Sequence, residues 1–136
     1  MNRSILQVAA AIIQREGKFL ITQRLEGDHL GGFWEFPGGK IEPGESFESC
    51  LERELAEELS VIIGVEKFWK KVRHAYPEKI VELHFYFCEL RTGVPEPRGC
   101  QAYRWVEPQE LVHFRFPPAD REIIEELAKG SCEEQR

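Results

Sequence analysis

Three glutamates in one short segment have the spacing of a metal-binding site. Glu54, Glu57 and Glu58 are three and four residues apart, so on a helix they lie on one face within reach of one another. Their charges repel unless one of them takes a proton or a cation lies among them. Ligands that are all oxygen suit Mg²⁺, or Mn²⁺ in its place, and Mg²⁺ keeps positions open for a substrate phosphate. The alternative is an acidic helix face exposed to solvent.

The residues around these acids favour the metal site. A Gly-Gly pair and a Pro-Gly turn precede the helix, and an arginine adjoins Glu54. From residue 39 to residue 61 the order is Gly39, five residues, Glu45, seven residues, Arg53-Glu54-Leu55, one residue, Glu57-Glu58, two residues and Val61. This order resembles the signature of the Nudix hydrolases at every position but one. So many fixed positions in so short a span make the resemblance specific.

Ser60 is the one departure, because the family pattern has glycine there. Glycine suits a left-handed residue that ends a helix, and another residue in that conformation costs roughly 1 to 2 kcal/mol. The departure concerns the helix end and removes no carboxylate. We therefore expect the chemistry to be retained.

The resemblance to MutT-like Nudix hydrolases covers most of the chain. It implies the α/β class and the Nudix fold, an α/β/α sandwich with a mixed β-sheet between the helix of the signature and the C-terminal helix. It also implies Mg²⁺-dependent hydrolysis of a nucleoside triphosphate, by attack at the β-phosphorus, to the monophosphate and pyrophosphate. An oxidised purine such as 8-oxo-dGTP is the expected substrate, and removing it from the nucleotide pool protects DNA.

The same resemblance assigns roles to individual residues. Glu54, Glu57 and Glu58, with a carbonyl of Gly38 or Gly39, are the expected metal ligands. Arg53, Glu54 and Glu57 are the expected catalytic residues; Arg53 orients Glu54, which either accepts a proton from water or shares the metal. The expected substrate-binding residues are Arg24, His29, Glu35, Phe36, Lys40 and Asp120. Taken alone, Arg24 is equally well an ordinary charge at a strand end, and Lys40 a solvated turn residue.

Asp120 leaves the nucleobase open. In MutT-like proteins the start of the last helix contacts the base, and those that favour 8-oxo-dGTP typically have asparagine there. A carboxylate only accepts hydrogen bonds unless it is protonated, so Asp120 suits the N–H groups of cytosine, adenine or 8-oxoguanine. CTP or a modified dCTP is therefore an alternative substrate, and an N-cap role for Asp120 is the structural alternative.

A fourth acid is missing from its usual place. MutT-like proteins often have a glutamate in the loop before the last strand, where this chain has Arg98-Gly99-Cys100-Gln101. Glu96 is near but out of register. Either the acids of the signature suffice, or Glu96 moves in to replace the missing glutamate.

Hydrophobic patterning predicts the same order of elements as the resemblance. The expected strands are Ile5–Ile13, Phe19–Arg24, a short one before a glycine turn at residues 38–39, a hairpin of Ile62–His74 and Lys79–Leu90, and Tyr103–Val106. Ser46 is the expected N-cap of the signature helix, which buries Phe47, Leu51, Leu55 and Leu59. A helical turn over Glu107–Leu111 and a helix over Arg121–Lys129 follow, and the charged tail after Gly130 is expected to fray.

Composition limits the possible partners. The 136 residues fit one domain, and the net charge of −6 argues against a nucleic-acid polymer or an anionic membrane. The four scattered cysteines fit neither a zinc site nor a disulfide framework, so a reducing, cytoplasmic setting is expected. We expect a monomer or weak homodimer. A non-catalytic binding module on the same fold is the alternative of another class, but it would require acids to be lost.

Overall fold

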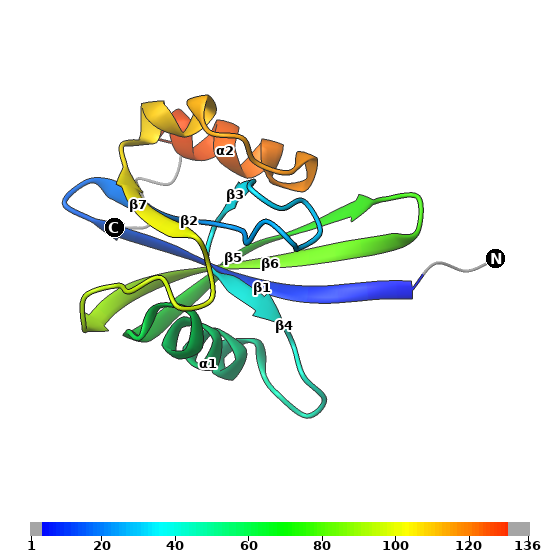
Figure 1. The fold of residues 1–136 in the computed structure, drawn as a ribbon, viewed down its shortest axis with the longest axis horizontal. Coiled ribbons are helices and arrows are strands. Elements are labelled where there is room, and N and C mark those ends of the chain that lie inside the picture. Colours follow the sequence, from blue (N-terminus) through cyan, green and yellow to red (C-terminus); the bar gives the residue numbers. More distant parts are fainter. Residues whose placement is uncertain (1–3, 131–136) are drawn as a thin grey trace.

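The computed structural model describes residues 4–130, which form a seven-stranded mixed sheet with one helix on each face (Figure 1). The strands are β1 Ser4–Arg15, β2 Lys18–Gln23, β3 Trp34–Glu35, β4 Gly38–Lys40, β5 Ile62–Ala75, β6 Lys79–Thr92 and β7 Ala102–Val106. The helices are α1 Phe47–Leu59 and α2 Arg121–Ala128, preceded by the short 3₁₀ helices η1 Pro108–His113 and η2 Pro118–Asp120. Residues 131–136, where fraying was expected, lie outside the described residues. No helix within the described part is long and apolar enough to cross a membrane.

β1 lies at the centre of the sheet. The spatial order is β3-β2-β1-β6-β5, with β4 paired to β1 and β7 paired to β2. β1 runs parallel to β6 from the pair Ser4–Lys79 to the pair Ile13–Cys88, whereas its pairs with β2 and β4 are antiparallel. A strand covered on both faces needs apolar residues on both, which explains the unbroken apolar run of β1.

Two hydrophobic cores separate the sheet from its helices. Successive residues of β1 alternate between them: Ala9 and Ala11 face α1, whereas Ala10 and Ile12 face α2. The predicted apolar stripe of α1 is confirmed, since Leu51, Leu55 and Leu59 are fully buried and Phe47 packs against the same core. This packing fixes the rotation of α1 about its own axis. It therefore decides which of the three glutamates can face the interior.

The β5–β6 hairpin joins the edge of the sheet to α2. Lys70 on β5 lies 2.6 Å from Glu126 and 3.3 Å from Glu122 of α2, both measured from its Nζ. Successive residues of β6 face opposite cores: Phe85 lies in the core beneath α2, and Tyr86 lies in the core beneath α1. The hairpin tip between the two strands includes Tyr76, which contributes to the site described below.

One local prediction was wrong, and one alternative is excluded. Gly38 and Gly39 form no turn but belong to β4, which pairs with β1. A side chain at Gly38 would place its Cβ 1.9 Å from the carbonyl oxygen of Ala9, so the glycine allows this close pairing. Asp120 makes no side-chain capping bond to α2, and its carboxyl is buried instead. By contrast, Ser46 caps α1 as predicted, accepting a hydrogen bond from the Ser49 N–H at 3.0 Å.

Ser60 has the left-handed conformation that its position in the signature predicts. Its φ is 58° and its ψ 39°, and its N–H donates to the carbonyl of Ala56 at 3.1 Å. The helix therefore ends at the same point as it would with glycine. The cost falls on the backbone of Ser60 itself.

We predict that Ser60→Gly stabilises the protein by roughly 0.5–1 kcal/mol, because relief of left-handed strain exceeds the added freedom of the unfolded chain. The matched control is Ala56→Gly, which puts the same residue into the exposed interior of α1 and should cost about 1 kcal/mol. Urea unfolding of both variants measures the two effects. Destabilisation by Ser60→Gly would show that residue 60 is not strained.

Candidate active site

The expected site residues come together around one cleft of about 730 Å³. All of them line this cleft except Arg53 and Glu57. The strands β1, β3, β4 and β6, the helix α1 and the turn before α2 all contribute to its wall. The acids of α1 lie on one part of this wall, and Asp120 reaches the cleft from the turn before α2.

Arg53 connects the acidic residues to their supports. Its Nε and Nη2 contact both carboxylate oxygens of Glu45, at 2.7 and 3.0 Å, and its Nη1 lies 3.0 Å from Glu54. Nη2 also donates to the carbonyl of Lys40 at 3.3 Å. The hydrogen bond from Arg53 lowers the pKa of Glu45 to about 2. One guanidinium thus ties β4 and the segment before α1 to the carboxylate of Glu54, and the predicted pairing of Arg53 with Glu54 is present.

Glu54 lies directly against β4. Its side chain is 16% exposed, and a Cβ on Gly39 would fall 2.3 to 2.4 Å from its carboxylate. No other residue type would leave this space. Burial raises the pKa of Glu54, although the hydrogen bond from Arg53 opposes that effect. The second glycine of β4 therefore lets the Glu54 carboxylate lie against the backbone of the strand.

Glu58 lies in an environment that disfavours its negative charge. Burial, with the nearby charge of Glu35, raises its pKa to about 8. Its Oε1 is buried and has no hydrogen-bond partner among residues 4–130. An acceptor left in this state costs about 1 to 3 kcal/mol unless a proton or a cation satisfies it. Glu58 thus has the environment expected of a ligand whose ion is not part of the protein chain.

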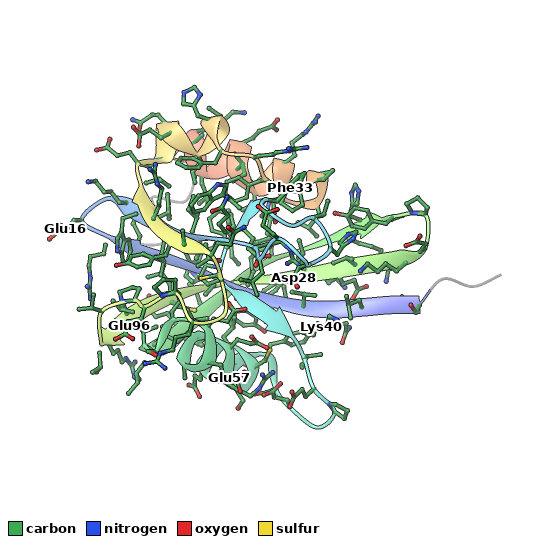
Figure 2. The ribbon with its side chains drawn as sticks, viewed as in Figure 1. Glu16, Asp28, Phe33, Lys40, Glu57 and Glu96 are labelled. Carbon is green, nitrogen blue, oxygen red and sulfur yellow. The ribbon has the colours of Figure 1, made fainter. Side chains whose placement is uncertain are left out.

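Glu57 is placed differently from Glu54 and Glu58. Its side chain is 62% exposed and pairs with Arg53 at 3.3 Å. Figure 2 shows it on the side of α1 that faces away from the sheet. From their spacing, all three acids were expected on one face of α1. The rotation of α1 against its core places only Glu54 and Glu58 in the cleft wall.

The loop before β7 supplies hydrogen-bond donors to α1. The N–H groups of Arg98 and Gly99 donate to the carbonyl of Glu58 at 2.9 and 3.1 Å, and that of Glu96 donates to the carbonyl of Leu59 at 2.9 Å. The side chain of Glu96 is 60% exposed and pairs with Arg98. Figure 2 shows Glu96 and Lys40 on opposite sides of α1. The loop therefore holds the end of α1, and Glu96 does not occupy the place of the missing acid.

Arg24 and Glu35 form an ion pair in the cleft wall. Arg24 Nη1 lies 2.8 Å from Glu35, and Arg24 Nε donates to the carbonyl of His29 at 2.7 Å. Burial raises the pKa of Glu35 even beside this arginine. The pair thus adds a third carboxylate near Glu54 and Glu58. Lys40, also in the wall, is exposed and makes no ion pair within residues 4–130.

Asp120 lies in an apolar part of the cleft. Its residue surface is 6% exposed, and burial raises its pKa to about 8. Phe36 is 4% exposed and packs against Phe116, with ring centroids 5.4 Å apart. Burial thus favours the neutral form of the Asp120 carboxyl, which can both donate and accept a hydrogen bond.

Sequence reasoning missed Tyr76, Lys79 and Asp28, which also line the cleft. Tyr76 and Lys79 come from the β5–β6 hairpin tip, and Asp28 from the loop after β2. No motif marks them, because their place depends on how the hairpin folds over β1. A lone aromatic residue at a hairpin tip was the only available signal.

The donor set suits a divalent cation that prefers oxygen. Within the described residues, no three side chains of His, Cys, Asp or Glu converge closely enough to form a ligand set by themselves. However, three neighbouring groups of the cleft wall offer only oxygen atoms as ligands. They are the unpartnered Glu58 carboxylate, the adjacent Glu54 and the backbone at Gly39. These residues fit Mg²⁺ or Mn²⁺ better than zinc.

Comparisons with known proteins agree with this geometry. The pattern of the NUDIX domain matches residues 8–126. The 8-oxo-dGTP diphosphatase of Haemophilus influenzae is 40% identical over 128 residues, covering 93% of this chain and 94% of that protein. The CTP pyrophosphohydrolase of Escherichia coli is 36% identical over 121 residues, covering 89% of this chain and 90% of that protein.

A solved structure supports the architecture. The MutT protein from Methanosarcina mazei Go1 superposes with a TM-score of 0.84, covering 96% of this chain and 98% of that chain. At 24% identity this likeness shows the fold alone. The predicted sandwich of a mixed sheet between two helices is confirmed.

We predict that Gly39→Ala weakens Mn²⁺ binding at least about tenfold, because the new Cβ must displace the Glu54 carboxylate and its bond to Arg53. Gly27→Ala is the matched control, since a Cβ at Gly27 meets nothing within 4 Å. Titration of each variant with Mn²⁺, followed by electron paramagnetic resonance, measures the affinity. Unchanged binding by Gly39→Ala would contradict the placement of the metal beside β4.

Proposed function

Because the chain belongs to the NUDIX domain family, we propose that this hydrolase converts 8-oxo-dGTP to 8-oxo-dGMP and pyrophosphate with Mg²⁺. The burial of the Asp120 carboxyl in the same cleft as Glu54 and Glu58 is the observation that carries base recognition by this residue, because burial favours its neutral form. The 40% identity with an 8-oxo-dGTP diphosphatase over nearly the whole chain supports an oxidised guanine as the base.

Asp120 can distinguish oxidised from normal guanine. Guanine presents two adjacent acceptors, N7 and O6, on one edge. Oxidation at C8 places a hydrogen on N7, so that edge then offers a donor beside an acceptor. A neutral carboxyl matches this pair, accepting from N7–H and donating to O6. Against dGTP its acceptor oxygen would face N7 without a hydrogen between them, which a buried site penalises strongly.

The residues at the other end of the cleft handle the phosphates. We assign Glu58 and the Gly39 carbonyl to the metal ion, with Glu54 facing it through the water that the ion would hold and with Glu57 as an outer ligand that would have to turn inward from solvent. Mg²⁺, when bound, neutralises phosphate charge and lowers the pKa of a bound water. Lys40, free of ion pairs within the described chain, and Arg24, which already pairs with Glu35, bind the phosphate oxygens.

Glu54 takes the proton of the attacking water in this scheme. Arg53 holds its Oε2, which leaves Oε1 as the accepting oxygen. The water oxygen forms a bond to the β-phosphorus, and the bond from that phosphorus to the bridging α–β oxygen breaks. The nucleoside monophosphate then departs with the bridging oxygen, and pyrophosphate carries the oxygen of the water.

A second candidate substrate is CTP or a modified dCTP. Cytosine offers an amino donor beside the N3 acceptor, which a neutral carboxyl also matches. The 36% identity with a CTP pyrophosphohydrolase supports this alternative. Both candidates share the metal end of the cleft and differ only in what Asp120 contacts.

We also propose that the enzyme works on free nucleotides in the cytoplasm. Cys50, Cys88 and Cys100 are buried and unpaired, which is compatible with a reducing compartment. A free nucleotide is the substrate that an acidic protein can bind through a metal ion and a few basic residues.

The first test is pyrophosphate release from 8-oxo-dGTP, dGTP, CTP, dCTP and 5-methyl-dCTP, with Mg²⁺ and with Mn²⁺. We predict that kcat/KM for 8-oxo-dGTP exceeds that for dGTP at least about a hundredfold. Glu58→Gln should lower kcat/KM at least about a hundredfold, because it removes an ionisable ligand at the metal end. Glu52→Gln, on an exposed face of the same helix, is the control.

The panel separates the alternatives. A lead of the cytidine nucleotides would replace the purine assignment with the pyrimidine one. No turnover of any of these nucleotides would contradict the hydrolase function itself and favour a binding module. Full activity of Glu58→Gln would remove Glu58 from the site.

We predict that kcat/KM for 8-oxo-dGTP, relative to that of the Asp120→Asn variant, falls as the pH rises through about 8, where Asp120 loses its proton and with it the only hydrogen that it can donate to O6. Asp120→Asn is the reference because an amide donates and accepts at any pH. The measured quantity is the ratio of the two enzymes' kcat/KM values for 8-oxo-dGTP between pH 6.5 and 9.5, where those pH limits lie roughly 1.5 units to either side of that pKa. Groups that act in both enzymes cancel in this ratio. A constant ratio would contradict the neutral-carboxyl hypothesis.

A further inference from the structure

Gln101 lies in the loop before β7, and its side chain reaches the backbone directly after β2. Its Nε2 donates a hydrogen bond to the carbonyl of Arg24 at 2.8 Å. We propose that Gln101 is a positioning residue, which fixes the backbone of Arg24 and thereby holds the Arg24 guanidinium where it binds substrate phosphate. This inference rests on the proposed function, because it concerns the phosphate end of the same cleft.

The loop that carries Gln101 is anchored at the end of α1. The N–H groups of Arg98 and Gly99 donate to the carbonyl of Glu58 at 2.9 and 3.1 Å. Cys100 is 6% exposed and belongs to the core beneath α1. Gln101 follows Cys100 directly, so its own backbone is held in place relative to the helix that carries the acids.

Gln101 makes two hydrogen bonds at the end of β2. Its backbone N–H donates to the carbonyl of Gln23 at 2.8 Å, and its side-chain amide donates to the carbonyl of Arg24. The same Nε2 lies 3.3 Å from Oε2 of Glu26. Both partners of the side chain are acceptors, which requires the amide nitrogen, with its two hydrogens, to face them. A substitution of the side chain removes these contacts and leaves the backbone bond intact.

The carbonyl of Arg24 also closes the loop of residues 25–32. It accepts a second hydrogen bond, from the N–H of Gly32 at 3.1 Å, and the Arg24 N–H donates to the carbonyl of Phe33 at 2.8 Å. The backbone of Arg24 is therefore held from two sides. The loop that follows it supplies one side, and Gln101 supplies the other.

The direction of the Arg24 side chain depends on this backbone. Its Nε donates to the carbonyl of His29 at 2.7 Å, and its Nη1 lies 2.8 Å from Glu35. A guanidinium is planar and donates in fixed directions, so a displaced backbone changes all of its contacts together. Arg24 and Glu58 line the same cleft. The loop before β7 thus sets the separation between the phosphate-binding charge and the metal end.

The test compares Gln101→Met with Gln109→Met. Methionine is also unbranched but donates no hydrogen bond, and Gln101 is exposed, so the substitution opens no cavity in a core. Gln109 is an exposed residue of η1 outside the cleft wall, which makes it the matched control.

The kinetic readout is KM and kcat for the nucleotide that the wild type hydrolyses best. We expect Gln101→Met to raise KM about two- to fivefold, the effect of one exposed hydrogen bond. The value of kcat should stay unchanged, because Arg24 binds phosphate in the ground state and in the transition state alike. Gln109→Met should change neither constant. In an Arg24→Ala background, Gln101→Met should have no further effect on KM, because it acts through Arg24.

Binding of inorganic pyrophosphate in the presence of Mg²⁺, measured by calorimetry, provides a readout without turnover. Gln101→Met should weaken this binding about two- to fivefold, and Gln109→Met should not change it. Unchanged binding by Gln101→Met, an unchanged KM, or an equal rise in KM in the Arg24→Ala background would each overturn the inference. Absence of pyrophosphate binding by the wild type would overturn it as well.

Failure of the proposed function is visible separately. The wild type would then hydrolyse none of the nucleotides, before any variant is compared. Pyrophosphate binding would still show whether Gln101 acts on Arg24, because it requires no hydrolysis and no particular base.

Discussion

The burial of several carboxylates in one cleft wall is the constraint that the rest of the site depends on. Burial raises the pKa of Glu35, Glu54 and Glu58, and neighbouring carboxylates add to the effect, most of all on Glu58, which lies near both Glu35 and Glu54. Arg53 compensates Glu54 from the outer side, and Arg24 compensates Glu35. Glu58 forms no ion pair within residues 4–130, and its buried Oε1 has no hydrogen-bond partner there. The protein chain alone thus leaves a local deficit of positive charge, which a divalent cation would remove.

Holding these charges together requires an unusual backbone on each side of α1. On one side, β4 approaches so closely that Gly39 has no room for a side chain. At the other end, N–H groups of the loop before β7 donate hydrogen bonds to the last carbonyls of the helix. Ser60 ends the helix in a left-handed conformation. The strain at Ser60 is the local cost of ending α1 directly after Glu58.

The spacing of the residues in and around the signature predicted the helix α1, its N-cap, its buried apolar stripe and the pairing of Arg53 with Glu54. The central strand and the hairpin followed from patterning as well. What sequence could not supply was the rotation of α1 against its core, which turns Glu57 outward. It also could not supply the environment of Asp120, whose neutral state depends on burial by residues far away in sequence. The Gly38–Gly39 pair was wrongly expected to form a turn, because a glycine needed for close strand pairing looks the same in sequence as one needed for a bend.

The two ends of the cleft are supported by different parts of the fold. The metal end rests on α1, β4 and the loop before β7, which Arg53 and backbone hydrogen bonds hold together. The base end rests on the β5–β6 hairpin tip and the turn before α2, which both line the cleft. Because the two ends rest on different elements, a substitution near Asp120 can change the base that is accepted with little effect on the phosphate chemistry. This separation gives a physical reason why relatives of similar identity act on an oxidised purine nucleotide in one case and on a pyrimidine nucleotide in another.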